Sequence, residues 1–521
     1  MDGGRRESCA IGARAGQLTE WAALAVIVAW ALAARWPGLV GPFGEGWQHV
    51  GAMYASQARN LMRYGPLATM GAGVLNAEVA PPDDWIWYIH HPPGHLWSMA
   101  ASSVLFGATA FAAKLPGVVA ALLQVVVTHR LVANALSVRA GLAAALMTAA
   151  LPAGAYFSTH GSELGPLTMA TGLLALLLDE RARARGPDRP AMAGVVAALT
   201  VSCLAAWVGV VFAGVIALRD LAGRRFRRAL VVALPAVLVA LVVMAQNVWV
   251  ERHHGDAIRG GSLLESFDGH GMDGLLRADI DVGFALQKLR GHARFDFTTA
   301  GAIAAVLGLI GLLVSLWRRT AESRAAGRLA LLLAAVALGY TVPLLQATLM
   351  HRYWLLVALP LVALLVGTAV HLAAVGRARA IATAMLLLAI AGSATLRVWR
   401  AHAHDATAWY EEAGRFVREQ TPPAAEVFTC EPDSACLGFY AQRSVKGGVS
   451  DALVPDGPPG DEPLLPSAHP WFLIALPPVM APAEPWTGVA AWLDRWFVPR
   501  IAVLDGGRHE ARLYDLSERA R

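Results

Sequence analysis

Residues 191–218, AMAGVVAALTVSCLAAWVGVVFAGVIAL, decide how the chain is arranged, because this run of 28 residues is uncharged and has an arginine cluster on each side. A membrane span needs about 20 apolar residues. Arginine gathers in cytoplasmic loops, so a single span would place one of the two clusters on the wrong face of the membrane. The run therefore predicts two short, mutually packed helices that turn near Trp207.

Working outward from this run, other apolar segments predict a polytopic α-helical membrane protein. These segments are 21–40, 116–134, 141–157, 165–179, 229–250, 298–316, 329–349, 353–373 and 380–397. Arginine clusters follow four spans, at Arg181/Arg183/Arg185/Arg189, Arg219/Arg224/Arg225/Arg227/Arg228, Arg318/Arg319/Arg324/Arg328 and Arg377/Arg379. Together with the two helices of the uncharged run, the segments make about 11 transmembrane helices. The clusters orient the chain with its N-terminus in the cytoplasm and its C-terminus outside.

The run 95–113 is apolar as well, but we expect it to lie on the outer surface as a juxtamembrane helix. It begins after two prolines, is interrupted by Gly107, and is followed by Lys114 and Pro116. These features argue against a continuous span.

This topology divides the chain into three parts. Residues 1–20 form a cytoplasmic tail, and residues 21–398 form the transmembrane domain, with outer loops at 41–115 and 251–297. Residues 399–521 are long enough for a small extracytoplasmic α/β domain. Its expected elements are a helix at 407–419, strands at Val427–Cys430 and Trp471–Leu476, a helix at 487–497, and strands at 500–505 and 511–516.

Composition excludes several classes of protein. With 56% hydrophobic and 16% charged residues, the chain is too apolar for a soluble globule. Its net charge of +5 belongs to the cytoplasmic loops, and no basic patch on a soluble domain indicates nucleic-acid binding. Four cysteines exclude a disulfide scaffold, although Cys430 and Cys436 could close a small loop outside the cytoplasm. The apolar run from Trp21 follows N-terminal arginines without a cleavage site, so it is expected to be the first membrane helix.

The first outer loop is dense in groups that can do chemistry. Its stretch 41–65 has apolar residues at helical spacing, which predicts an interfacial helix with polar groups on one side; a solvated loop is the alternative. The chemically active side chains of this loop are Glu45, Trp47, His49, Tyr54, Arg59, Asn60, Arg63, Glu78, Asp83, Asp84, His90, His91 and His95.

Glu163 lies in a turn between two spans, on the same outer side. An ionisable group at the membrane edge is costly to place, which makes it a functional candidate. Its structural alternative is a helix N-terminus, where a carboxylate complements the helix dipole.

Two further tracts carry imidazole or guanidinium groups on the outer side. His90 and His91 precede a rigid Pro-Pro pair and can present their rings to a phosphate or a metal, or simply form a polar turn. At the outer end of a later span, His351 and Arg352 precede a Tyr-Trp pair typical of the membrane interface. Arg352 there can snorkel or bind phosphate.

Four stretches together resemble the GT-C glycosyltransferases, in particular the family 39 bacterial relatives of protein O-mannosyltransferase and of the lipid A aminoarabinose transferase. They are MYASQARNLMRYG (53–65), HHPPGHLWSMAASSVLFGATAFAAKLPGVV (90–119), AYFSTHGSELGPL (155–167) and HRYWLLVALPLVALLVG (351–367). The second is the most specific, because Pro-Pro, Phe-Gly and a basic residue before Leu-Pro recur in that order in the family.

The resemblance implies an inverting enzyme of the plasma membrane that moves a sugar from a polyprenyl-phosphate donor to a hydroxyl on the outer face. The acceptor is a lipid, a polysaccharide or a protein. Glu163 matches the second acidic position of the family. His91, His351, Arg352 and Arg59 are the candidates for binding the donor phosphate. A divalent metal ion is left open, with Glu45, Glu163 and His90 as its candidate ligands.

The chain departs from the family at the first acidic position. Relatives have Asp or Asp-Glu four and three residues before the loop tyrosine, where this chain has Val50 and Gly51. Either a different path of the loop brings the Glu45 carboxylate to the position of the missing acid, or His49 acts as the base, or the activity is altered or lost. We favour Glu45.

Three other functions compete with this hypothesis. A transporter of lipid-linked glycans would carry charges in the middle of its spans and broken helices in two matching halves. A polymerase or ligase using the same donors would have its long outer loop late in the chain. A catalytically silent member binding an envelope partner is consistent with the missing acidic pair.

Overall fold

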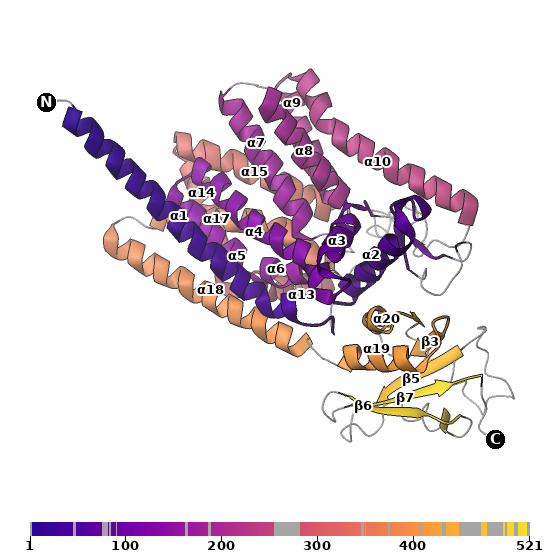
Figure 1. The fold of residues 1–521 in the computed structure, drawn as a ribbon. Helices are drawn as coiled ribbons and strands as arrows, with labels where there is room; N and C mark the ends of the chain where they lie inside the picture. The colour runs from indigo at the N-terminus through magenta and orange to yellow at the C-terminus, as the bar shows by residue number, and fades with distance from the viewer. Residues whose placement is uncertain are drawn as a thin grey trace.

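The computed structural model describes residues 3–44, 48–75, 82, 85–89, 91–161, 165–185, 189–254, 282–344, 348–349, 351–373, 376–405, 409–429, 434–446, 470–476, 493–494, 497–504 and 509–517. Helices up to residue 405 form an elongated bundle, and a small α/β unit lies beside the end of the bundle farther from the N-terminus (Figure 1). The chain therefore has two parts, a helical bundle and a small C-terminal α/β unit.

Seven stretches of helix in the described residues are long and apolar enough to cross a membrane. They are α1 (Gly3–Val40, apolar from Gly16), α4 (Ala110–Ala135), α10 (Phe226–His254), α14 (Thr299–Trp317), α15 (Ala321–Thr341), η3 (Arg352–Ala358) with α17 (Leu359–Ala373), and α18 (Arg377–Asp405). An eighth forms if α5 (Val138–Ala150) is one span with α6 (Pro152–Ala155) and η2 (Phe157–Thr159), from which it is bent by 59°. The polytopic membrane fold is confirmed.

The predicted number of about 11 spans also requires three shorter or more polar helices. These are α7 (Pro166–Arg185), α8 (Arg189–Ala205) and α9 (Trp207–Ala222). They lie beside the long helices in Figure 1. The count itself stays a prediction.

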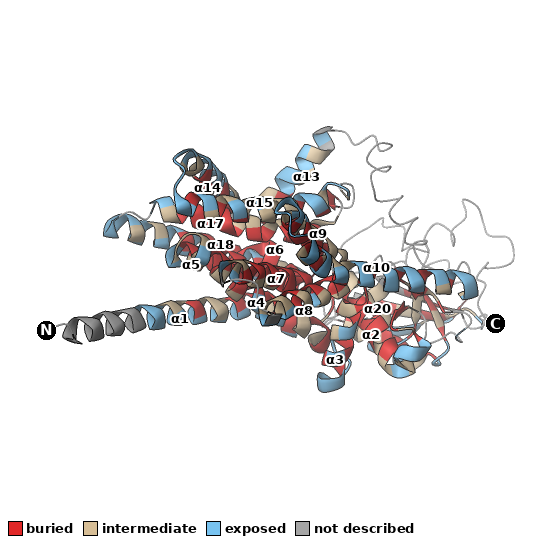
Figure 2. Cartoon of the chain, turned by 90° about the horizontal axis from the view of Figure 1, so that it is seen from above, coloured by how far each residue is buried: buried red, intermediate tan, exposed pale blue. Residues whose placement is uncertain are grey.

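The surface of the bundle is apolar where it would meet lipid. Buried residues gather along the middle of the bundle, whereas the outer helices α10 and α14 are largely exposed (Figure 2). Leu230 of α10 is 72% exposed and Leu313 of α14 is 58% exposed. Soluble proteins rarely expose apolar patches of this extent, so the burial pattern agrees with a membrane environment.

The uncharged run 191–218 forms two helices, as predicted. Helix α8 ends at Ala205 and α9 begins at Trp207. Gly209 allows the sharp turn, because a Cβ atom there would lie 2.2 Å from the backbone of Ser202.

The predicted juxtamembrane helix 95–113 is shorter than expected. It is α3 (Gly94–Phe106), and it ends at Gly107, whose φ of +79° a residue with a side chain adopts only under strain. Thr109 then caps α4 by accepting a hydrogen bond from the amide of Ala112. The expectation that 110–113 belong to the juxtamembrane helix was wrong, and Lys114 lies inside α4.

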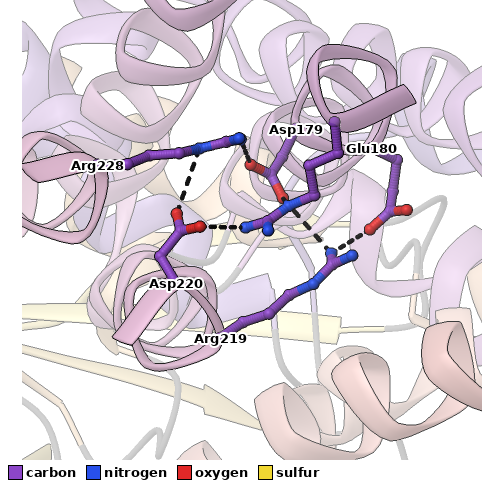
Figure 3. Close-up of polar contacts among 6 residues, drawn as sticks. Asp179, Glu180, Arg219, Asp220 and Arg228 are labelled. Atoms are coloured by element: carbon purple, nitrogen blue, oxygen red, sulfur yellow. Dashed lines mark hydrogen bonds and ion pairs between the residues drawn. The ribbon is translucent and has the colours of Figure 1, made fainter. Parts of the chain in front are cut away.

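Part of the arginine excess is neutralised by acidic side chains. At the end of the bundle where α7 and α9 finish and α10 begins, Asp179, Glu180 and Asp220 form ion pairs with three arginines (Figure 3). These arginines are Arg183, Arg219 and Arg228. Asp179 and Asp220 are completely buried, so the network joins three helices in a partly dry setting.

Replacing Asp179 by alanine should lower the free energy of unfolding by about 3–5 kcal/mol, because it removes the buried carboxylate that three partly buried guanidinium groups share. Glu180→Ala is the matched control, since the Glu180 side chain is 40% exposed and an exposed pair contributes about 1 kcal/mol or less. The measurement is unfolding in mixed micelles as a function of SDS. Equal and small losses in both variants would contradict a stabilising role for this network.

The C-terminal residues form a five-stranded mixed sheet with strand order β4-β3-β5-β7-β6. Its strands are β3 (Glu426–Thr429), β4 (Ser444–Lys446), β5 (Pro470–Leu476), β6 (Arg500–Leu504) and β7 (His509–Asp515). Strand β3 runs parallel to β4 and β5, and β7 runs antiparallel to β5 and β6. Two helices, α19 (Trp409–Gln420) and α20 (Ser434–Ala441), precede and follow β3.

This sheet confirms the small α/β fold expected from the sequence. The strands expected at Val427–Cys430, Trp471–Leu476, 500–505 and 511–516 correspond to β3, β5, β6 and β7. Most of the helix expected at 487–497 lies outside the described residues. Cys430 lies outside the described residues, so the possible disulfide between Cys430 and Cys436 stays a prediction. Cys436 is buried, and its sulfur donates to the carbonyl oxygen of Gly44 at 3.2 Å.

Candidate active site

The beginning of the first outer loop is held by Lys114 of α4. The ammonium group of this fully buried residue donates to the carbonyl oxygens of Gly38, Gly41 and Pro42 at 2.9–3.0 Å, and to the side-chain oxygen of Gln48 at 3.2 Å. Gln48 is the first residue of α2 (Gln48–Ala68). Lys114 therefore ties the end of α1 to the start of the loop helix.

Helix α20 of the C-terminal unit holds the same backbone from the other side. The amide of Phe43 donates to the hydroxyl oxygen of Tyr440 at 2.6 Å, and the amide of Gly44 donates to Gln48 at 3.3 Å. Burial raises the pKa of Tyr440, so the phenol stays protonated. The residues on both sides of segment 45–47 are thus fixed by contacts with α4 and α20.

The turn that leads to Glu163 packs directly on α2. His160 and Gly161 follow η2, and the carbonyl oxygen of Gly161 accepts a hydrogen bond from Nε2 of His95 in α3 at 2.9 Å. A Cβ atom on Gly51 would lie 1.8 Å from the carbonyl oxygen of His160. The helix that follows Glu45 and the turn that precedes Glu163 are therefore in direct contact.

Gly51→Ala should lower the free energy of unfolding by about 1–3 kcal/mol, because the added methyl group meets a backbone oxygen in a packed contact. The matched control is Gly214→Ala in the helix α9, where a Cβ atom meets nothing within 4 Å and alanine favours the helix. Thermal unfolding of the detergent-solubilised protein followed by circular dichroism measures both. An unchanged Gly51→Ala variant would rule out the close contact.

The rings of Tyr156, His160 and His402 pack against one another at this turn. The ring of Tyr156 lies 4.1 Å from that of His160 and 5.1 Å from that of His402 in α18. Nδ1 of His160 donates to the carbonyl oxygen of Tyr156 at 2.7 Å, which leaves Nε2 as an acceptor. Burial lowers the pKa of His160 well below its usual range, so its ring is neutral near pH 7.

An ion pair between Asp296 and Arg352 lies beside Phe295, whose ring is next to that of Tyr156. Asp296, immediately after α13 (Val282–Phe295), is completely buried and accepts a hydrogen bond from Nη2 of Arg352 at 2.9 Å. Its other carboxylate oxygen lies 3.1 Å from Nδ1 of His292. The guanidinium carbon of Arg352 lies 3.8 Å from the ring centroid of Phe295, whose ring is 6.2 Å from that of Tyr156.

Within the described residues, Arg352 uses only part of its hydrogen-bonding capacity. Its side chain is 29% exposed, and its only hydrogen bond to a described residue is the one to Asp296. A guanidinium group has five N–H donors, so Arg352 can bind an anion while Asp296 holds it in place.

The fold and part of the sequence are similar to those of known proteins. Residues 90–249 match the family model described as dolichyl-phosphate-mannose-protein mannosyltransferase. Crystal structures of ArnT from Cupriavidus metallidurans align over almost the whole chain. The apo structure has a TM-score of 0.57 at 14% identity, over 96% of this chain and 98% of that chain. The structure bound to undecaprenyl phosphate has a TM-score of 0.59 at 15% identity, over 94% and 97%.

The chain has the GT-C glycosyltransferase fold. A third solved structure with this similarity is the Archaeoglobus fulgidus oligosaccharyltransferase in the apo form, with a TM-score of 0.54 at 13% identity over 82% of this chain and 64% of that chain. No curated protein matches the chain in sequence. Residues 90–249 thus resemble a family of glycosyltransferases, within a chain that has the GT-C fold.

The structure describes only some of the predicted GT-C site residues. Glu45, Glu163 and His90 lie outside the described residues, so their convergence stays a prediction. His49 is half-buried in the first turn of α2. His91 is half-buried beside a narrow cavity lined by residues of α2 and α10, and its ring lies 5.8 Å from that of Tyr88.

The other predicted phosphate-binding residues differ in their surroundings. His351 packs beside Tyr353 and Trp354, with ring centroids 5.6 and 6.0 Å away. Arg59 donates to the carbonyl oxygen of Phe439 at 2.8 Å and lies over its ring. Arg59 thus contacts α20, and Arg352 is the better placed of the two arginines to bind a phosphate.

Sequence reasoning missed Asp296 and His292. Both precede the span that begins near Thr299, and an acidic residue at a membrane edge is the same signal that singled out Glu163. His402 was missed because it stands at the far end of a span, 242 positions from His160 in the sequence. Only the packing of α18 against α6 brings it to the turn.

The candidate metal ligands cannot be tested by this geometry, because all three lie outside the described residues. Among the described side chains, no group of three or more His, Cys, Asp and Glu residues could hold a metal ion.

Proposed function

We propose that this protein transfers a sugar from a polyprenyl-phosphate donor to a hydroxyl group, with inversion, at the end of the bundle where α2, the turn at 156–161 and Arg352 meet. The observation that carries the proposal is Arg352, a partly exposed guanidinium held by the buried carboxylate of Asp296. The similar ArnT structure bound to undecaprenyl phosphate supports a donor of this kind.

The proposed role of Arg352 is to bind the donor phosphate and stabilise the charge that develops on it. A fixed cation in a partly dry site stabilises such charge more than water does. The ion pair with Asp296 and the contact with Phe295 hold the guanidinium, so little rotamer freedom is lost when the phosphate binds. His91 and His351 are proposed as further phosphate contacts.

Transfer requires a base on the acceptor side. The acceptor oxygen attacks the anomeric carbon of the sugar, and the bond from that carbon to the phosphate oxygen breaks with its electron pair. A hydroxyl proton is too weakly acidic to leave beforehand, so it moves to a carboxylate as the bond breaks. The products are the glycosylated acceptor, the polyprenyl phosphate and the protonated carboxylate, which then loses its proton to water.

We assign this carboxylate to Glu45, with Glu163 as the second acidic group. Position 51, where relatives have an acid, packs against the carbonyl oxygen of His160 and holds no side chain. The contacts of Lys114 and α20 hold the backbone next to Glu45, and the contacts of α3 hold the turn next to Glu163. This packing favours a base displaced to Glu45 over one at residue 51.

We place the reaction on the outer face of the plasma membrane. The arginine-rich ends of the spans and the N-terminus share the opposite end of the bundle, which is the expected cytoplasmic side. The acceptor is proposed to be a lipid, a polysaccharide or a protein hydroxyl that reaches this outer end.

Arg352→Ala should weaken the binding of undecaprenyl phosphate by about 10- to 100-fold, because a charge-assisted hydrogen bond contributes about 1.5–3 kcal/mol. Arg290→Ala is the matched control, since Arg290 is exposed on α13 and makes no contact with Asp296 in the described part of the chain. Native mass spectrometry of the full-length protein in detergent measures both affinities. Wild-type affinity in Arg352→Ala would contradict the assignment.

A further inference from the structure

An apolar groove lies at the opposite end of the bundle from the candidate active site. Its cavity volume is about 980 Å³, and residues of α1, α5, α17 and α18 line it. This volume is at the upper end of the range of about 300–1,000 Å³ that is usual for small-molecule sites. Helices α1 and α18 run side by side along it (Figure 1).

The groove has the length of one leaflet of a bilayer. Along α18 it extends from Arg377 to Leu388, eleven helical steps of about 1.5 Å each, or about 17 Å. Half of the hydrocarbon core of a bilayer measures about 15 Å. At its far end, Nε1 of Trp30 in α1 donates to the hydroxyl of Thr395 in α18 at 2.9 Å, which joins the two helices.

Two arginines mark the mouth of the groove. Arg139 in the first turn of α5 and Arg377 in the first turn of α18 both line the cavity, and both are exposed. Among the described residues, neither makes an ion pair or a side-chain hydrogen bond, and none of the described lining residues is acidic. The other lining residues are almost all apolar.

We propose that this groove binds one anionic glycerophospholipid of the surrounding leaflet, with its phosphate between Arg139 and Arg377 and an acyl chain along α18. The charge at the mouth complements an anionic headgroup, and the apolar length matches an acyl chain of that leaflet. The site is separate from the proposed donor site, since Arg139 and Arg377 begin their helices at the end that carries the N-terminus, whereas Arg352 lies at the other end.

The first experiment compares ligands on the unmodified, full-length protein by native mass spectrometry. The probes are phosphatidylglycerol, phosphatidylcholine, glycerol 3-phosphate and undecaprenyl phosphate. Phosphatidylglycerol is expected to bind at least about tenfold more tightly than phosphatidylcholine, and glycerol 3-phosphate should not compete with it. Equal binding of the two phospholipids, or full competition by glycerol 3-phosphate, would overturn the proposal.

Variants then locate the site. Arg139→Ala/Arg377→Ala should remove the preference for phosphatidylglycerol, and Ala384→Trp should lower the binding of both phospholipids by filling the groove. Arg318→Ala/Arg319→Ala is the matched control, because these exposed arginines at the end of α14 do not line the groove. An unchanged preference for phosphatidylglycerol in Arg139→Ala/Arg377→Ala would overturn the proposal. It would also be overturned if undecaprenyl phosphate competes with phosphatidylglycerol and this competition is lost in Arg139→Ala/Arg377→Ala, because the polyprenyl lipid would then be the occupant.

Discussion

Glu163→Gln and Glu45→Gln, as separate variants, are expected to lower the turnover of sugar transfer by about 10²–10⁴-fold, because each removes a carboxylate from the proposed proton-transfer step. Glutamine keeps the size and polarity of the side chain, so the fold should be retained. The assay follows release of polyprenyl phosphate from a sugar-linked donor in proteoliposomes.

Two further variants separate the possible bases. Glu251→Gln is the matched control, since Glu251 is exposed at the end of α10. His49→Ala tests the histidine next to α2's first residue, and we expect a smaller loss there than in Glu45→Gln. Wild-type turnover in both Glu45→Gln and Glu163→Gln would rule out the assignment and leave a different activity or a silent protein.

Asp296→Ala is expected to reduce donor binding by about as much as Arg352→Ala and to lower the free energy of unfolding by about 3–5 kcal/mol. Asp296 is completely buried, and its loss leaves Arg352 and His292 without their shared acceptor. The readouts are undecaprenyl phosphate affinity by native mass spectrometry and SDS unfolding in mixed micelles.

A double-mutant cycle distinguishes a positioning role from a general loss of stability. If Asp296 acts through Arg352, the double variant should bind the donor lipid no more weakly than Arg352→Ala alone. Asp296→Asn keeps an oxygen acceptor and should recover part of the affinity. Additive losses in the double variant would show that Asp296 does not work through Arg352.

The spans could be predicted because their signal is local. An apolar run of about 20 residues and the arginines beside it need no knowledge of the rest of the chain. The break at Ala206 followed from the arginine clusters on both sides of the uncharged run alone. The end of α3 could not be predicted in this way, because the apolar residues 110–113 fit α3 and α4 equally well. The conformation of Gly107 decides where α3 ends.

The candidate site could be predicted only in part, because its contacts join distant segments. The region of the site followed from the motifs, and Arg352 was named among its residues. The clamp by Lys114, the hydrogen bond of Tyr440 to Phe43 and the pairing of Asp296 with Arg352 join residues 56 to 397 positions apart. No periodicity in the sequence carries that information.

The most direct test of the proposed function is turnover by the purified full-length protein with a polyprenyl-phosphate-linked sugar in proteoliposomes. We predict release of polyprenyl phosphate coupled to inverted transfer of the sugar to an acceptor, with activity lost in Arg352→Ala and Glu163→Gln and retained in Arg290→Ala. Failure of the unmodified protein to consume any such donor, when supplied with lipid, polysaccharide and protein acceptors, would contradict the account.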